Sequence, residues 1–117
     1  MMEYSRKDPV ILAECLVKVI KENKIEDNNL YYILADYVLK TWEDLNPHNA
    51  MELVDTISRE DIGKDNTKLF LEITTNLLLE KCFDFWNEVK TNTAGHCYIN
   101  SLIKNNMNYL IPKTIDS

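Results

Sequence analysis

The chain has 117 residues, 45% of them hydrophobic, and a formal net charge of −6. This length supports one hydrophobic core and is too short for two, so we expect a single domain over residues 1–117. The surplus of acids argues against nucleic acid as a partner, because phosphate binding needs a surplus of Lys and Arg. No apolar run approaches the roughly 18 residues of a membrane span, and Glu14 and Lys18 interrupt the first one, so we expect neither a secretory leader nor a membrane partner.

Long periodic segments with only two Gly and three Pro between them predict an all-α protein. The odd number of cysteines and the lack of a Cys-x-x-Cys pair argue against a disulfide framework. Cys15 and Cys82 fall inside apolar helical patterns, where reduced core thiols are expected. Together these features favour a cytoplasmic location.

The first helix is expected from the Asp8-Pro9 start signal to about Asn23. Its apolar stripe is Leu12, Cys15, Leu16, Val19 and Ile20. After a polar loop, a cap at Asp27, Asn28 or Asn29 starts a second helix. Its stripe is Leu30, Leu34, Val38, Trp42 and Leu45. On another side of this helix, Tyr32, Ala35 and Leu39 form a second patch, which either faces a further helix or remains open.

Asn46-Pro47 repeats the start signal and predicts a short third helix. Its apolar positions are Ala50, Leu53, Val54 and Ile57. The connection from Ser58 to Asp65 holds at most one helical turn.

A cap at Asp65 or Asn66 starts a long fourth helix to Lys90, with no Gly or Pro inside it. Its main stripe is Leu71, Thr74, Leu78, Cys82, Phe85 and Val89. A second stripe is apolar in the first half and acidic in the second, running through Leu69, Ile73, Leu77, Glu80, Asp84 and Glu88. The first half is therefore expected to be enclosed by other helices, and the second half to face solvent.

After a turn at residues 91–95, a fifth helix is expected to run until Pro112 stops it. Its inward positions are Tyr98, Leu102, Ile103, Met107 and Leu110. About five helices with loose ends at 1–7 and 112–117 favour an irregular bundle. The alternative is a HEAT-like stack of two helical hairpins, residues 8–45 and 46–90.

The negative charge is concentrated between residues 43 and 65. This segment contains seven acidic and two basic residues, so it carries −5 of the chain's net charge of −6. Such a run is either a solvated surface whose acids complement helix dipoles or an anionic docking face. As candidate partner-binding residues we take these acids, two from the fourth helix and a neighbouring tryptophan: Glu43, Asp44, Glu52, Asp55, Glu60, Asp61, Asp65, Glu80, Asp84 and Trp86.

Candidate chemistry is sparse. His48 and Glu52 have the helical spacing of two metal ligands, but two ligands are too few for a site. His96 and Cys97 are adjacent, so their side chains point to different sides of a helix and do not form a dyad. The isolated glycines form no phosphate-binding loop. We therefore expect no enzyme activity, no cofactor and no metal.

The leading hypothesis is a binding module whose acidic surface docks on a basic protein partner. Its most specific form is an immunity or inhibitor protein that neutralises a nuclease-type toxin, since a nuclease active site must be basic. The alternative is a helical scaffold that binds an amphipathic partner helix in an apolar groove near Tyr32 and Leu39, in the manner of death-regulator-like or viral host-modulating proteins.

Overall fold

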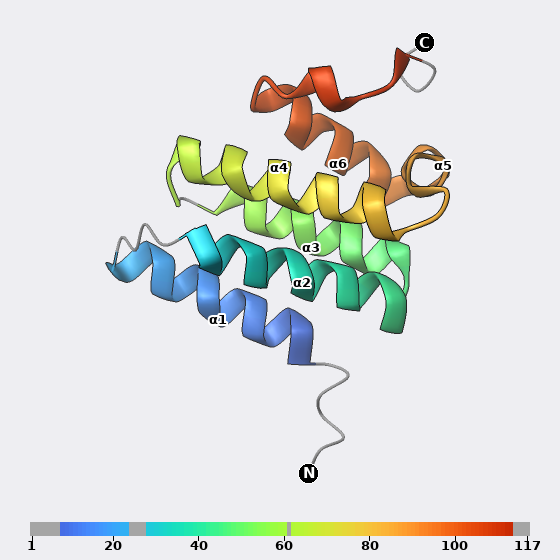
Figure 1. Cartoon of the computed structure of the whole chain (residues 1–117). Helices are drawn as coiled ribbons and strands as arrows, with labels where there is room; N and C mark the ends of the chain where they lie inside the picture. The colour runs from blue at the N-terminus through green and yellow to red at the C-terminus, as the bar shows by residue number, and fades with distance from the viewer. Residues whose placement is uncertain (1–7, 24–27, 61, 114–117) are drawn as a thin grey trace.

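The periodic segments fold as helices. The computed structural model describes residues 8–23, 28–60 and 62–113, and this part of the chain holds six α-helices, one 3-10 turn and no strand (Figure 1). In chain order they are α1 (Asp8–Asn23), α2 (Asn28–Asp44), α3 (Pro47–Arg59), α4 (Lys64–Lys81), α5 (Phe85–Thr91), α6 (Thr93–Lys104) and η2 (Asn108–Leu110). The all-α prediction is confirmed, with one helix more than expected. Of the predicted loose ends at 1–7 and 112–117, residues 1–7 and 114–117 lie outside the described residues.

The helices form one globule, in which α1 to α4 run in alternating directions (Figure 1). In Figure 1, α2 and α4 lie side by side with the same direction, and α3 passes behind them the opposite way. α1 packs against the outer side of α2, and α6 packs against α3. The radius of gyration is 13.7 Å, close to the roughly 13 Å of a compact domain of this size. This packing leaves α2 and α4 with one shared face turned away from α3.

α3 is the helix that the sequence predicts best. The Asn46 side chain accepts a hydrogen bond of 2.8 Å from the backbone N–H of Asn49, and Pro47 follows at the first helical position. All four apolar positions expected to face inward are buried, together with Met51. The strong amphipathic pattern of this segment allows only one face to be buried, which is why the prediction holds.

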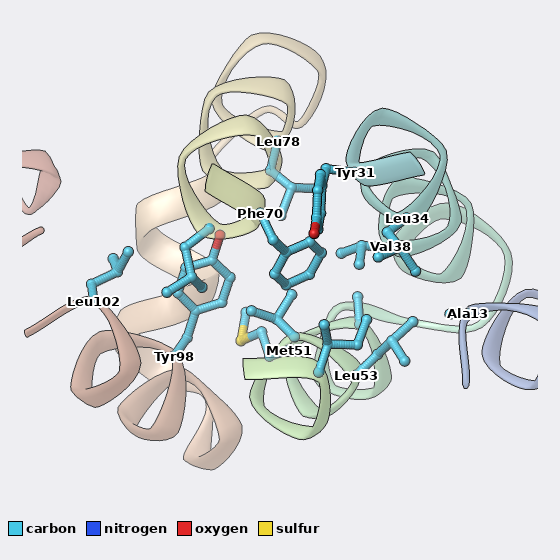
Figure 2. Close-up of a cluster of buried hydrophobic side chains, with 14 of the residues drawn as sticks. Ala13, Tyr31, Leu34, Val38, Met51, Leu53, Phe70, Leu78, Tyr98 and Leu102 are labelled. Carbon is cyan, nitrogen blue, oxygen red and sulfur yellow. The ribbon is translucent and has the colours of Figure 1, made fainter. Parts of the chain in front are cut away.

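The core lies between α2, α3, α4 and α6, as Figure 2 shows. Its largest fully buried side chains are Tyr31, Leu34 and Val38 of α2, Met51 and Ile57 of α3, Phe70, Leu71 and Leu78 of α4, and Tyr98 and Leu102 of α6. Removing each aliphatic side chain from water contributes about 1.5–3 kcal/mol. α4 therefore supplies much of the core, but only along one side.

Of the stripe expected on α1, Ile20 is buried and Leu16 is half-buried, but the other described members are not. Ala13, Val17 and Ile20 are buried, whereas Cys15 and Val19 are exposed, so the prediction that Cys15 is a core thiol is wrong. This segment is apolar nearly all round, and spacing alone does not choose between neighbouring stripes. The small Ala13 allows a close approach of α1 to the core. The side chain of Leu12 lies outside the described residues.

The predicted continuous helix from Asn66 to Lys90 is broken. α4 ends at Lys81, Asp84 takes the left-handed conformation at φ 60°, and α5 begins at Phe85. Asp is one of the few residues other than Gly that tolerates this conformation. The break directs Phe85 into a buried aromatic cluster, with ring centroids 5.4 Å from Trp42 and 5.7 Å from Tyr98.

The start of α4 and both ends of α6 also differ from the predictions. α4 begins at Lys64 with Gly63 at the cap position, and Asn66 Nδ2 instead donates a hydrogen bond of 2.7 Å to the Ile62 carbonyl. α6 begins at Thr93, inside the predicted turn, and ends at Lys104, well before Pro112. Met107 is nevertheless buried, because its backbone N–H donates to the Leu102 carbonyl at 2.8 Å and holds the chain against α6.

Gly95 marks a close approach of two helices. A Cβ atom at this position would lie 1.7 Å from the backbone oxygen of Val89. Only glycine permits α6 to start this near α5. None of the helices in the described residues is long and apolar enough to cross a membrane.

Candidate docking groove

The acids of residues 43–65 do not form one patch. Glu43 and Asp44 are exposed at the end of α2, whereas Glu60 and Asp65 lie at the opposite end of α3. The 13 residues of α3 separate these two groups by roughly 20 Å. Asp61 lies outside the described residues. The charge that is contiguous in sequence is therefore spread over the molecule.

Three acids of this segment have cationic or imidazole neighbours. Carboxylate oxygens of Asp55 and Glu60 lie 3.1 Å from Arg59 and 2.9 Å from Lys21, respectively. Glu52 lies 3.4 Å from His48. Pairs this exposed contribute little to stability, but each cation reduces the local negative potential. These acids are thus less available to an external cation than the sequence suggests.

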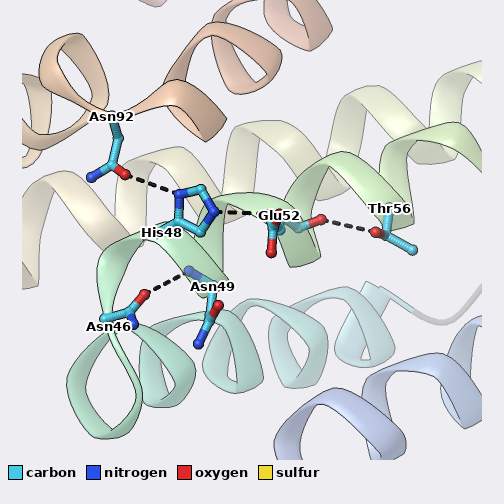
Figure 3. Close-up of polar contacts among 6 residues, drawn as sticks. All are labelled: Asn46, His48, Asn49, Glu52, Thr56 and Asn92. Atoms are coloured by element: carbon cyan, nitrogen blue, oxygen red, sulfur yellow. Dashed lines mark hydrogen bonds and ion pairs between the residues drawn. The ribbon is translucent and has the colours of Figure 1, made fainter.

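His48 connects two helices. Its Nδ1 lies 3.0 Å from Oδ1 of Asn92, the residue before α6, and its Nε2 faces Glu52 (Figure 3). Within the described chain, no group of three or more His, Cys, Asp or Glu residues is arranged to hold a metal ion. The contacts of His48 therefore fit a structural link between α3 and the start of α6.

Neither Cys97 nor Cys82 has the features of a catalytic nucleophile. Cys97 is half-buried in the wall of a cleft between α3 and α6 that also includes Arg59 and Lys104, and neighbouring His96 is exposed and does not line that cleft. Burial, with a smaller effect of the Glu43 carboxylate, raises the pKa of Cys82 to about 11. A thiol with this pKa is protonated near neutral pH and is a poor nucleophile.

A groove runs between α2 and α4 on the face turned away from α3. It has a volume of about 480 Å³. Its apolar lining consists of Leu69, Ile73 and Leu77 on α4 and Tyr32 on α2. The three α4 side chains are half-buried, and Tyr32 is 57% exposed. The prediction that Leu69, Ile73 and Leu77 are enclosed by other helices is therefore wrong.

The rim of this groove is acidic. Its charged lining residues are the three acids Asp36, Glu72 and Glu80, and no Lys or Arg lines the groove. Glu72 and Glu80 lie two turns apart on one face of α4, with Asn76 between them, and Asp36 lies on the α2 wall. Apolar surface and negative charge thus occur together in the lining of this groove.

Two other surface clefts differ in charge. The cleft between α1 and α3 contains Lys18 and Lys21 as well as three glutamates, and the cleft between α3 and α6 contains Arg59 and Lys104 beside Asp55. Their charges are mixed, so neither favours a partner of one sign. The α2–α4 groove is distinguished by its single sign of charge.

Of the ten residues predicted to bind a partner, Glu80 is the one that lines this groove. Asp84 sits at the break after α4, so Glu80, Asp84 and Glu88 do not form one helical row. Trp86 is half-buried, with its ring centroid 4.8 Å from Phe85, while neighbouring Phe83 is 91% exposed.

Sequence reasoning did not select Asp36 and Glu72 as site residues. A signal for Glu72 was nevertheless present on α4. Polar residues recur every four positions at Glu72, Asn76 and Glu80, next to the apolar row that begins at Leu69, and this pattern indicates a half-exposed helix face. The alternative hypothesis of a groove near Tyr32 and Leu39 named α2, but nothing in the sequence aligns Tyr32 with α4, and Leu39 does not line the groove.

No protein-family model, curated protein or solved structure matches this chain. The physical features of the groove therefore carry the functional inference.

Proposed function

We propose that the protein is a non-enzymatic binding module whose acidic surface docks on a basic protein partner. The supporting observation is the α2–α4 groove, where three acids and no Lys or Arg line a surface that also includes partly exposed apolar side chains. A partner that brings Lys or Arg to this rim gains charge complementarity, and it also covers apolar surface.

The other acids extend the field of this surface. The side chains of Glu43, Asp44 and Asp65 are exposed and form no hydrogen bond or ion pair with the described residues. Summed surface potential steers a partner of opposite charge and raises association rates by roughly 10- to 1000-fold at low salt. These residues are proposed to accelerate encounter, and the groove to hold the partner.

In its most specific form, the proposal describes an immunity or inhibitor protein for a nuclease-type toxin. A nuclease binds phosphate through Lys and Arg, so its active site offers the cationic surface that the groove requires. Carboxylates at the rim would occupy positions that phosphates take in the substrate. The net charge of −6 supports this form.

We further propose that the fold works as a stack of helical hairpins, α1–α2 and α3–α4, rather than as an irregular bundle. In such a stack, the second helices of consecutive hairpins form one continuous surface, which is the part that helical repeats use for binding. α2 and α4 hold these positions (Figure 1).

Charge reversal tests the proposal. The double variant Glu72→Lys, Glu80→Lys is compared with Glu14→Lys, Glu22→Lys, which changes the net charge equally on exposed positions of α1. Partners captured from the native host are expected to be basic, to be lost in the groove variant and to be retained by the α1 variant. Raising salt from about 0.05 to about 0.5 M is expected to slow association strongly.

The proposal fails if capture is unchanged both by the groove substitutions and by high salt. It also fails if the two double variants lose binding equally, because the location of the charge would then be irrelevant.

A further inference from the structure

We infer that the basic partner presents an amphipathic α-helix to the groove between α2 and α4. This inference rests on the proposed function and specifies the shape of the partner as well as its charge.

The first argument is that α2 and α4 already hold a helix on their other side. α3 packs behind this pair with Ala50, Met51 and Val54 facing the core (Figure 1). On the outer side, no helix of the described residues covers the groove, and its apolar lining remains partly exposed. A helix lying there would repeat the packing of α3, with axes about 8–10 Å from those of its neighbours.

The second argument is the spacing of the apolar side chains. Leu69, Ile73 and Leu77 recur every four residues and form a straight ridge along α4, with steps of about 6 Å. A partner helix with apolar residues at i, i+4 and i+7 offers a matching ridge. Tyr32 stands on the opposite wall, and exposed tyrosines of this kind commonly act as binding hot spots.

The third argument is that acids flank the apolar floor on both walls. Glu72 and Glu80 lie on α4, and Asp36 lies on α2. The fitting ligand therefore carries Lys or Arg on both sides of its apolar stripe. From Leu69 to Glu80 the groove is about 17 Å long, which corresponds to about three turns of partner helix.

Charge also argues against a second copy of this chain as the occupant. Each copy carries a net charge of −6, and its rim acids would face another acidic surface. Anionic lipid is disfavoured for the same reason.

Two synthetic peptides of identical composition test the inference with the full chain. Both have about 18 residues of Leu and Lys, but only one places its leucines on a single helical face. The amphipathic peptide is expected to bind at least tenfold more tightly by fluorescence anisotropy, and to gain helical circular dichroism on binding. The second peptide has the same net charge, but its leucines do not form an apolar stripe along one face of a helix.

Matched variants locate the binding. Tyr32→Ala and Ile73→Asn are each expected to weaken the amphipathic peptide roughly five- to tenfold. Their controls are Tyr109→Ala, at a tyrosine that is 66% exposed, and Ile103→Asn on α6, which are expected to leave affinity unchanged. Thermal unfolding of each variant checks that it is folded, and the exposed Tyr32 provides a test that does not depend on Ile73.

Three results would overturn the inference. If both peptides bind equally and only charge reversal weakens them, the acidic docking function stands and helix recognition fails. If neither peptide binds, helix recognition fails, and capture from the host decides the docking function separately. If the chain forms a dimer that Ile73→Asn dissociates, the groove is occupied by a second copy.

Discussion

The hydroxyl groups of Thr75 and Tyr98 lie 2.7 Å apart in the fully buried region between α4 and α6. Burial raises the pKa of Tyr98, an effect that the hydrogen bond to Thr75 partly opposes. The phenol therefore remains neutral, and each hydroxyl satisfies the other in a place that water does not reach. This bond links α4 to α6, whose main neighbours are α3 and α5.

Removing one hydroxyl of this pair is expected to destabilise the protein. Thr75→Val leaves a buried phenol without a partner, and Tyr98→Phe does the same to Thr75, so each costs about 1–3 kcal/mol of unfolding free energy. The double variant is expected to cost less than the sum, which urea denaturation measures. Tyr31→Phe is the control, because the buried Tyr31 hydroxyl has no hydrogen-bond partner within the described residues. Its removal is expected to be neutral or stabilising.

Gly95→Ala is expected to be the most damaging small substitution. The added methyl group meets the backbone of Val89, which cannot rotate away as a side chain can, so the cost is about 3 kcal/mol or more. At Gly63 an added methyl group meets only the Asn66 side-chain amide, 3.3 Å away, so Gly63→Ala suffers mainly from its φ of 99°, a cost of about 1–3 kcal/mol. A thermal melt that finds Gly95→Ala as stable as Gly63→Ala would contradict the close approach of α5 and α6.

Two phenylalanines on either side of Asp84 are expected to behave oppositely. Phe85 is buried among Trp42 and Tyr98, so Phe85→Ala is expected to cost about 3–5 kcal/mol. Phe83 is almost fully exposed, and Phe83→Ala is expected to change the unfolding free energy by less than about 0.5 kcal/mol. Equal effects in urea denaturation would mean that the chain does not turn at Asp84.

Stability is expected to fall at alkaline pH, partly through Cys82. The thiol ionises near pH 9.0 in an unfolded chain and near 11 in the fold. Below pH 9 both states keep the proton, so the thiol adds no pH dependence. As the pH rises from 9 to about 11, the unfolded state loses a proton that the folded state retains, and unfolding becomes easier.

Denaturation at a series of pH values, compared with Cys82→Ala, isolates this contribution. The variant is expected to lose stability less steeply between pH 9 and about 11. Alkylation under native conditions gives a second measure, since exposed Cys15 is expected to react well before Cys82. A fast-reacting Cys82 would contradict its burial.

The outcome for each helix reflects how much of its environment is local. The boundaries and inward face of α3 follow from a local cap and a strict amphipathic pattern, and both were predicted. The face of α1 was not, because several apolar stripes compete and only the neighbouring helices select one. The break at Asp84 lacks Gly or Pro, and it is favoured by the burial of Phe85 against distant residues. The candidate groove likewise depends on α2 and α4 lying together, which no local pattern specifies.

The left-handed residue Asp84 also decides the outline of the molecule. An unbroken helix from Lys64 to Thr91 would have 28 residues and measure about 42 Å, as much as the longest dimension of the whole domain, 42 Å. The C-terminal part of this helix would extend without neighbouring helices to pack against, and α6 would start far from α3. By turning the chain at this corner, Asp84 lets α6 lie along α3. The turn at Asp84 thus brings residues 93–104 beside α3, within a domain no longer than the unbroken helix alone would be.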